Sequence, residues 1–170
     1  MINRTQFFDN IKTSFIAKLS QLQVDSINAI LDEIEEQNVT DKRHIAYIFA
    51  TAWHETAHTL TPVTEYGGPK YLKSKKYYPY IGRGFVQLTW DYNYKKYSKI
   101  MGIDFVTHPD LVLEVKASAF ILVHGMINGT FSGKKLSDYN TFVSMRKIIN
   151  GTDKAQLIAG IADRFLLALA

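Results

Sequence analysis

The sequence contains no cysteine, and this absence excludes several kinds of structure and site. A chain of 170 residues without cysteine can form no disulfide framework, no thiolate metal site and no cysteine nucleophile. Long apolar runs are missing too: stretches such as 119–123 fall far short of the roughly 18 residues that span a bilayer. The first residues show no apolar segment of the secretory type. We therefore expect a soluble protein made in a reducing cytosol.

The overall composition is that of an ordinary globular domain. Hydrophobic residues make up 46% and charged residues 21%, which is too apolar and too weakly charged for a disordered chain. The length suits one domain over 1–170. Twenty basic against sixteen acidic residues give a formal charge of +4, a weak indication of an acidic partner.

Hydrophobic periodicity predicts a mainly α protein with one irregular insertion. Apolar residues recur at helical spacing near both the start and the end of the chain. The insertion lies near 62–86, where prolines and glycines cluster, and we expect a small β-hairpin or loop there. Besides two helices within the first 40 residues, the pattern predicts helices over about 41–60, 90–101, 110–127, 140–150 and 153–169.

Acidic residues are unevenly distributed, and this bears on function. Between positions 42 and 90 the only acids are Glu55 and Glu65, among seven basic residues. Glu55 ends an apolar helical stretch, and Glu65 follows Pro62, so the chain can turn and bring them face to face. Two carboxylates in different surroundings are what glycoside hydrolysis requires, one as acid and one to activate water. The plainer interpretation is that both are surface glutamates.

A competing motif overlaps Glu55. Residues 54–58 read H-E-T-A-H, which matches the zinc-protease pattern H-E-x-x-H. On a helix, His54 and His58 would share a face and could hold zinc, with Glu55 as the base. The extended pattern needs Gly at 61 and His at 64, where this chain has threonine. A zinc metalloprotease is therefore kept as a minor alternative.

Longer motifs carry a resemblance to a known family. Residues 52–57 (AWHETA) and 80–94 (YIGRGFVQLTWDYNY) resemble the family 19 glycoside hydrolases, which include plant-type chitinases and many phage endolysins. HPDL at 108–111 and IING at 148–151 look like two further family segments. The resemblance covers about 44–169, giving a core over 41–170, and the N-terminal helical segment 1–40 resembles the start of phage endolysins.

The resemblance implies a lysozyme-like α+β fold with a central cleft and an inverting mechanism. Glu55 matches the general acid, and Glu65 is the natural second carboxylate in the shorter endolysin pattern. Thr89 matches a position that holds the attacking water. In an inverting enzyme the carboxyl groups stand about 6.5–9.5 Å apart to admit that water.

Six further residues match or accompany substrate-binding positions of the family. Arg83 and Arg164 are expected to orient the carboxylates by charge pairing. Tyrosines in this region are more often packing residues than sugar platforms, and Tyr92 is kept as a candidate sugar contact. The candidate substrate-binding residues are Gln87, Asn93, Asn150, Arg83, Arg164 and Tyr92.

The leading hypothesis is an endolysin of a phage or prophage that cleaves the β-1,4 glycan of peptidoglycan. The alternatives are a chitinase, a catalytically silent wall-binding module and a basic nucleic-acid-binding domain built on 70–80 (KYLKSKKYYPY). The leading hypothesis requires no metal or cofactor and no nucleic acid. It implies a monomer, made in the host cytoplasm, that reaches the wall only after a holin-like partner has permeabilised the membrane.

Overall fold

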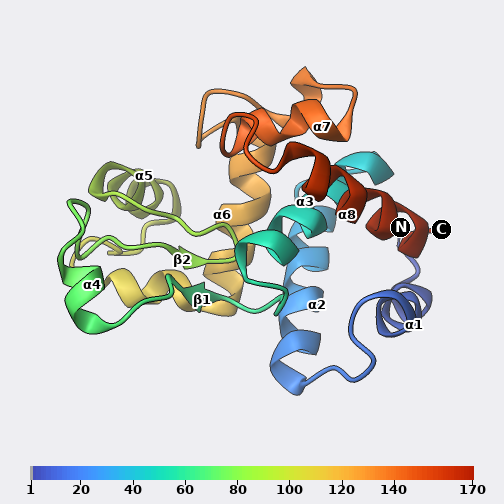
Figure 1. Ribbon diagram of the computed structural model, residues 1–170, viewed down its shortest axis with the longest axis horizontal. Helices are drawn as coiled ribbons and strands as arrows, with labels where there is room; N and C mark the ends of the chain where they lie inside the picture. The colour runs from blue at the N-terminus through green and yellow to red at the C-terminus, as the bar shows by residue number, and fades with distance from the viewer. Residues whose placement is uncertain (1) are drawn as a thin grey trace.

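The structure is a computed structural model that describes residues 2–170, and helices dominate it. Figure 1 shows two groups of elements, with α1, α2, α3 and α8 at one end and the small sheet, α4 and α5 at the other. The α-helices are α1 (Arg4–Ser14), α2 (Gln21–Glu36), α3 (Lys42–Glu55), α4 (Pro69–Lys73), α5 (Asp91–Met101), α6 (Val115–Asn128), α7 (Phe142–Met145) and α8 (Ala155–Ala168). Short 3-10 helices are η1 (Pro109–Leu113), η2 (Leu136–Asp138) and η3 (Arg146–Ile148). The mainly α fold predicted from the sequence is confirmed.

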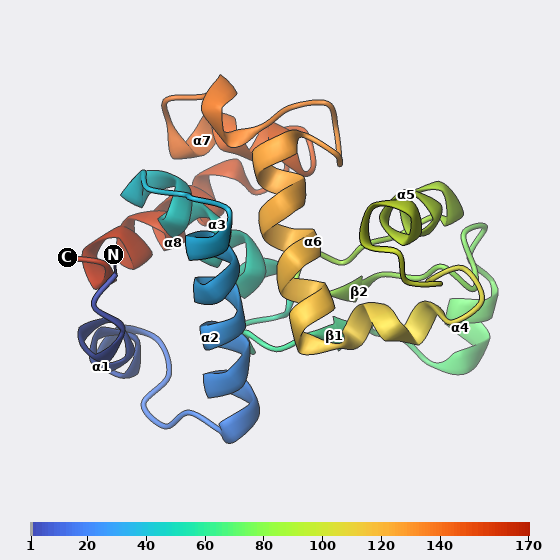
Figure 2. The same cartoon turned by 180° about the vertical axis from the view of Figure 1, so that it is seen from behind.

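Helix α3 is the central element of the core. Asp41 caps its start by accepting a hydrogen bond from the backbone N–H of Arg43 at 2.8 Å, and every residue over 45–53 is buried. It packs against α8, whereas α2 packs against α6, as Figure 2 shows from behind. Phe49 stands between Phe7 of α1 and Phe165 of α8, with ring centroids 5.0 and 5.6 Å away. Residues 55 and 56 at the end of α3 are thereby held on a rigid support.

The predicted hairpin near 62–86 is also confirmed. Strand β1 (Val63–Thr64) pairs antiparallel with β2 (Arg83–Gly84), in a register that places Val63 opposite Gly84. Helix α4 lies within the long connection between the two strands. The hairpin leaves the core after the end of α3 and returns toward α6 (Figure 1).

Three of the predicted helices differ in the structure, and the one predicted over 140–150 is the short α7 (Phe142–Met145) followed by η3 (Arg146–Ile148). The helix predicted over 41–60 ends at Glu55, because Thr56 donates a hydrogen bond to the carbonyl of Ala52 and accepts one from the backbone N–H of Leu60. Residues 57, 58 and 60 then adopt positive φ angles. The helix predicted over 110–127 is divided at Glu114, whose extended backbone separates η1 from α6. Local hydrogen bonding prevails over apolar periodicity at these ends.

Every helix within residues 2–170 is too short or too polar to span a lipid bilayer.

Gly84 joins the hairpin to α6, and its replacement tests that contact. Its φ is +86°, and an added Cβ would lie 2.6 Å from Ser118 Oγ, which accepts a hydrogen bond from the buried N–H of Phe85. We expect Gly84→Ala to lower the free energy of unfolding by about 3 kcal/mol, through left-handed strain and loss of that hydrogen bond. Denaturant unfolding measures the change.

Gly133→Ala is the matched control, since its φ is +80° with open space around the Cβ position. This substitution should lower the free energy of unfolding by about 1 kcal/mol, through backbone strain alone. Equal losses in the two variants would contradict the contact between Gly84 and Ser118.

Candidate active site

A cleft lies beside the end of α3, and five of the residues predicted from the sequence line it together. Its volume is about 570 Å³, and its walls come from α3, the hairpin, the segment before α5 and the turn after η3. The five predicted residues are Glu55, Glu65, Gln87, Thr89 and Asn150. Segments far apart in the sequence therefore meet in one open cavity.

Glu55 is the most buried acid of the cleft. Its side chain is 18% exposed, and its Oε1 accepts a hydrogen bond from Nη1 of Arg146 at 3.2 Å. Nε of Arg146 donates to the carbonyl of Asp153 at 2.7 Å, so the guanidinium is fixed from two sides. Burial raises the pKa of Glu55 above its ordinary value, while the Arg146 charge acts in the opposite direction without cancelling it. A raised pKa favours the protonated form of the carboxyl group, which is the form that a general acid needs.

Glu65 lies just after β1 and is held by two donors. The hydroxyl of Tyr77 donates to its Oε1 at 2.7 Å, and the backbone N–H of Gly82 donates to its Oε2 at 3.1 Å. Burial, followed by the contact with Glu65, raises the pKa of Tyr77 to about 12, so its hydroxyl keeps its proton and remains a donor. Each oxygen of Glu65 thus has one hydrogen-bond donor, and each can accept a further hydrogen bond from water.

Thr89 and Gln87 line the same cleft as the two acids. The hydroxyl of Thr89 donates to the carbonyl of Gln87 at 2.9 Å, which leaves its oxygen free to accept a hydrogen bond from water. The side-chain amide of Gln87 donates to the carbonyls of Val63 and Gly84, at 2.9 and 3.2 Å. Gln87 therefore links the two strands of the hairpin through its amide nitrogen. Its side-chain oxygen is the atom that can accept a hydrogen bond from a ligand.

Of three further predicted sugar contacts, one lines the cleft and two lie next to residues that line it. Asn150 lines it directly. Asn93 donates to the carbonyl of Thr89 at 2.8 Å and lines a small neighbouring pocket of about 130 Å³. Tyr92 is 56% exposed and stacks on the outer side of the Trp90 ring, with centroids 6.1 Å apart. Asn93 and Tyr92 are thus adjacent to the residues that line the cleft.

The expected charge pairing of Arg83 and Arg164 with the carboxylates is wrong. Arg83 is buried and pairs with Asp110 at 3.1 Å, and it also donates to the carbonyl of Pro79 and the hydroxyl of Tyr94. Arg164 lies on α8 against α1, where it donates to the carbonyl of Ser14 and stands over the Phe15 ring. Both arginines therefore stabilise packing, since their guanidinium groups donate to acceptors other than Glu55 and Glu65.

The zinc interpretation loses its geometric basis. Since α3 ends at Glu55, His58 leaves the helix and stacks on Trp53, with ring centroids 5.0 Å apart. His54 and His58 consequently do not share a helix face. Within residues 2–170, no group of three or more histidine or acidic side chains is placed to hold a metal ion.

Three residues of the site were missed by sequence reasoning. Arg146 is the cation that pairs with Glu55. In the sequence, the feature that could have indicated it is an arginine within the largely apolar stretch before Asn150. Tyr77 lies in the basic run over 70–80, which the sequence connects only with the nucleic-acid-binding alternative. Trp90 lines the cleft and packs edge-on against Tyr77, with centroids 5.2 Å apart.

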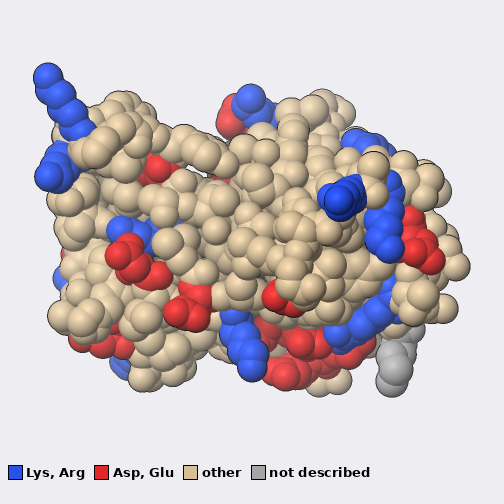
Figure 3. Space-filling view, turned by 90° about the horizontal axis from the view of Figure 1, so that it is seen from below, with Lys and Arg blue, Asp and Glu red and all other residues tan. Residues whose placement is uncertain are grey.

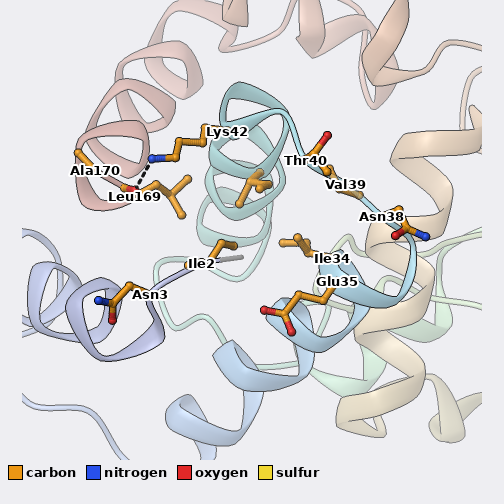
Figure 4. Close-up of a pocket in the computed structure, with 11 residues that line it drawn as sticks. Ile2, Asn3, Ile34, Glu35, Asn38, Val39, Thr40, Lys42, Leu169 and Ala170 are labelled. Carbon is orange, nitrogen blue, oxygen red and sulfur yellow. Dashed lines mark hydrogen bonds between the residues drawn. The ribbon is translucent and has the colours of Figure 1, made fainter.

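A second cavity, of about 490 Å³, lies away from these residues. Figure 4 shows it between the start of α1, the end of α2 and the last turn of α8, with Lys42 donating to the carbonyl of Leu169 at 3.1 Å. Its one carboxylate side chain, Glu35, pairs with Arg4. The cavity lacks the two facing acids of the cleft.

The link between Glu55 and Arg146 yields a direct prediction. Replacing Arg146 by Met removes the charge that stabilises ionised Glu55, so we expect the pKa of Glu55 to rise further. NMR titration of the Glu55 side-chain carboxyl carbon measures this. Arg164→Met is the matched control, because Arg164 contacts residues 14 and 15 instead of the cleft. A Glu55 pKa that is the same in wild type and Arg146→Met would contradict the proposed coupling.

Part of the chain is similar to known chitinases. Residues 45–126 match the model of the family described as chitinase class I. An endochitinase of Arabidopsis thaliana is 35% identical over 129 residues, which cover 72% of this chain and 44% of the relative. An acidic endochitinase of Dioscorea japonica is 39% identical over 79 residues, 42% of this chain and 31% of the relative. The chain thus spans less than half the length of these relatives.

Solved structures share the fold along the whole chain. A bacterial family 19 chitinase, whose structure was described as differing from plant enzymes, superposes with a TM-score of 0.70 and 24% identity, covering 99% of this chain and 95% of the other. Chitinase C from Streptomyces griseus superposes with a TM-score of 0.64 and 22% identity, over 99% and 76% of the two chains. The family-model match and the endochitinase relatives show that part of this chain is similar to the family 19 chitinases, and the solved structures show that it shares their fold.

Proposed function

We propose that this chain is an endolysin-type glycoside hydrolase that cleaves the β-1,4 glycan strands of peptidoglycan by acid/base catalysis with inversion. The observation that carries the proposal is the pair of acids in one cleft. Glu55 is buried with a raised pKa, whereas Glu65 is held by two hydrogen-bond donors. Two carboxyl groups in such different surroundings suit an acid and a base.

In the proposed reaction, Glu55 gives its proton to the glycosidic oxygen as the bond to the anomeric carbon breaks. Glu65 takes a proton from a water that attacks this carbon from the opposite face, while Thr89 accepts a hydrogen bond from the same water. The water oxygen becomes the new anomeric hydroxyl, and the leaving sugar departs as an alcohol. The configuration at the anomeric carbon is inverted in this single displacement. Gln87 and Asn150 are proposed to contact sugar from the cleft wall, with Asn93 beside them.

Peptidoglycan is the proposed substrate for two reasons. The short spacing between Glu55 and Glu65 and the N-terminal segment of the sequence resemble phage endolysins. The connection between β1 and β2, which contains the cleft residues Tyr66 and Tyr77, also carries exposed lysines. Chitin oligomers are the second candidate, favoured by the endochitinase relatives. Both polymers present β-1,4-linked N-acetylated sugars, so the same two acids would serve either one.

The endolysin role also implies where the protein acts. We propose that the chain forms a single catalytic domain that works as a monomer. It would be made in the host cytoplasm and would reach the wall after a holin-like protein has permeabilised the inner membrane.

Glu55→Gln tests the acid directly. The amide keeps the shape of the side chain but cannot donate the proton, so hydrolysis should fall by at least about 100-fold. Release of reducing sugar from purified peptidoglycan and lysis of outer-membrane-permeabilised bacteria measure the loss. The far-ultraviolet circular dichroism should be unchanged.

The matched control for this variant is Glu36→Gln, which replaces an exposed glutamate at the end of α2 and should retain full activity. Retained hydrolysis by Glu55→Gln would contradict the assignment. Mass spectrometry of the released muropeptides identifies the cleaved bond from the reducing-end sugar. Wild-type activity confined to chitin oligomers would favour the second candidate substrate.

A further inference from the structure

We propose that the surface of the β1–β2 connection binds the carboxylate groups of the peptides that branch from peptidoglycan strands. The surface, here called the basic edge, consists of Lys70, Tyr71, Lys73, Lys76 and Tyr78. This inference rests on the proposed function and adds a recognition surface outside the catalytic cleft. It would favour an anionic branched glycan over neutral chitin.

The basic edge is open to solvent, and its charges have no acidic partner. Helix α4 has no buried residue, and all five side chains of the edge are exposed. Among residues 2–170, no carboxylate oxygen lies within 4 Å of Lys70, Lys73 or Lys76, although exposed lysines elsewhere, such as Lys12 and Lys95, do pair with acids. Three cations thus remain available within seven residues.

One aromatic ring of the edge is held in place despite its exposure. Tyr71 is 50% exposed, but its ring packs directly on Gly67, where an added Cβ would lie 2.4 Å from Cδ1. The ammonium of Lys75 stands 3.9 Å from the centroid of the same ring. A fixed aromatic face flanked by lysines offers both stacking and charge to a ligand.

Along the chain, the edge adjoins residues that line the cleft. Tyr66 and Tyr77 line the cleft, and they stand immediately before and after the segment 67–76. Glu65, held by Tyr77, is only five residues from Lys70. A glycan strand lying in the cleft would therefore carry its side branches across the basic edge. Peptidoglycan bears peptide branches that end in carboxylates, whereas chitin bears neutral acetamido groups.

Charged side chains are unevenly placed on the face that Figure 3 shows. Basic side chains project at its upper left, at the end that holds α4 and α5 in Figure 1, with some acidic side chains nearby, and acidic side chains gather most closely at the lower middle. Helix α2 alone carries five acids. An anionic polymer would be attracted to the α4 end and repelled from α2, which favours one orientation on the protein.

The test is a binding assay with purified sacculi that carry no teichoic acid. The chain carrying Glu55→Gln is used throughout, so that hydrolysis does not consume the ligand, and binding is measured by co-sedimentation. Adding K70Q, K73Q and K76Q should raise the Kd about tenfold and flatten its dependence on salt. A matched triple variant, K12Q, K18Q and K116Q, removes three exposed lysines outside the edge and should bind as before.

Three results would overturn the inference: equal weakening by both triple variants, unchanged binding to sacculi whose carboxylates have been methyl-esterified, or tighter binding to a single-stranded oligonucleotide than to sacculi. The binding readout is independent of catalysis. A wild-type protein that bound sacculi through these lysines without cleaving them would refute the proposed function and leave the basic edge intact.

Discussion

The buried pair of Glu55 and Arg146 is the interaction on which the rest of the site depends. A carboxyl group at the end of an apolar helix would stay neutral under burial alone, and a cation alone would keep it ionised. Here both influences act within 3.2 Å, and burial prevails. The aromatic packing of α3 against α1 and α8 fixes one partner, and the carbonyl of Asp153 fixes the other. Removing either side chain of the pair would leave the other buried without its partner.

The opposite wall of the cleft is built by different means. The hairpin has only two short strands, so side chains hold its shape: Gln87 bonds the carbonyls of Val63 and Gly84, and buried Arg83 joins Asp110 to the carbonyl of Pro79. Close contact between Gly84 and Ser118 seats the hairpin on α6. Glu65 and Thr89 are thereby presented to Glu55 from an element with little core of its own.

Much of this arrangement could be predicted from the sequence, because periodicity, proline and glycine clusters and long motifs are local signals. They gave the helical fold, the hairpin near 62–86 and the group of Glu55, Glu65, Gln87, Thr89 and Asn150. The end of α3 was missed because the hydroxyl of Thr56 terminates the helix within an apolar pattern. Arginine partners were also missed: pairing depends on which acceptor is nearest in space, so Arg146 took the role expected of Arg83 and Arg164.

The central claim is that Glu55 and Glu65 act in one displacement on the glycan. The anomeric form of the first product tests it most directly, because a single attack by water inverts the configuration. Proton NMR of a chitin or peptidoglycan oligomer, recorded during the first minutes of hydrolysis, distinguishes the two forms before they equilibrate. The account predicts that the new reducing end appears as the α-anomer. Initial release of the β-anomer would mean retention through a second displacement and would contradict the assigned roles of both acids.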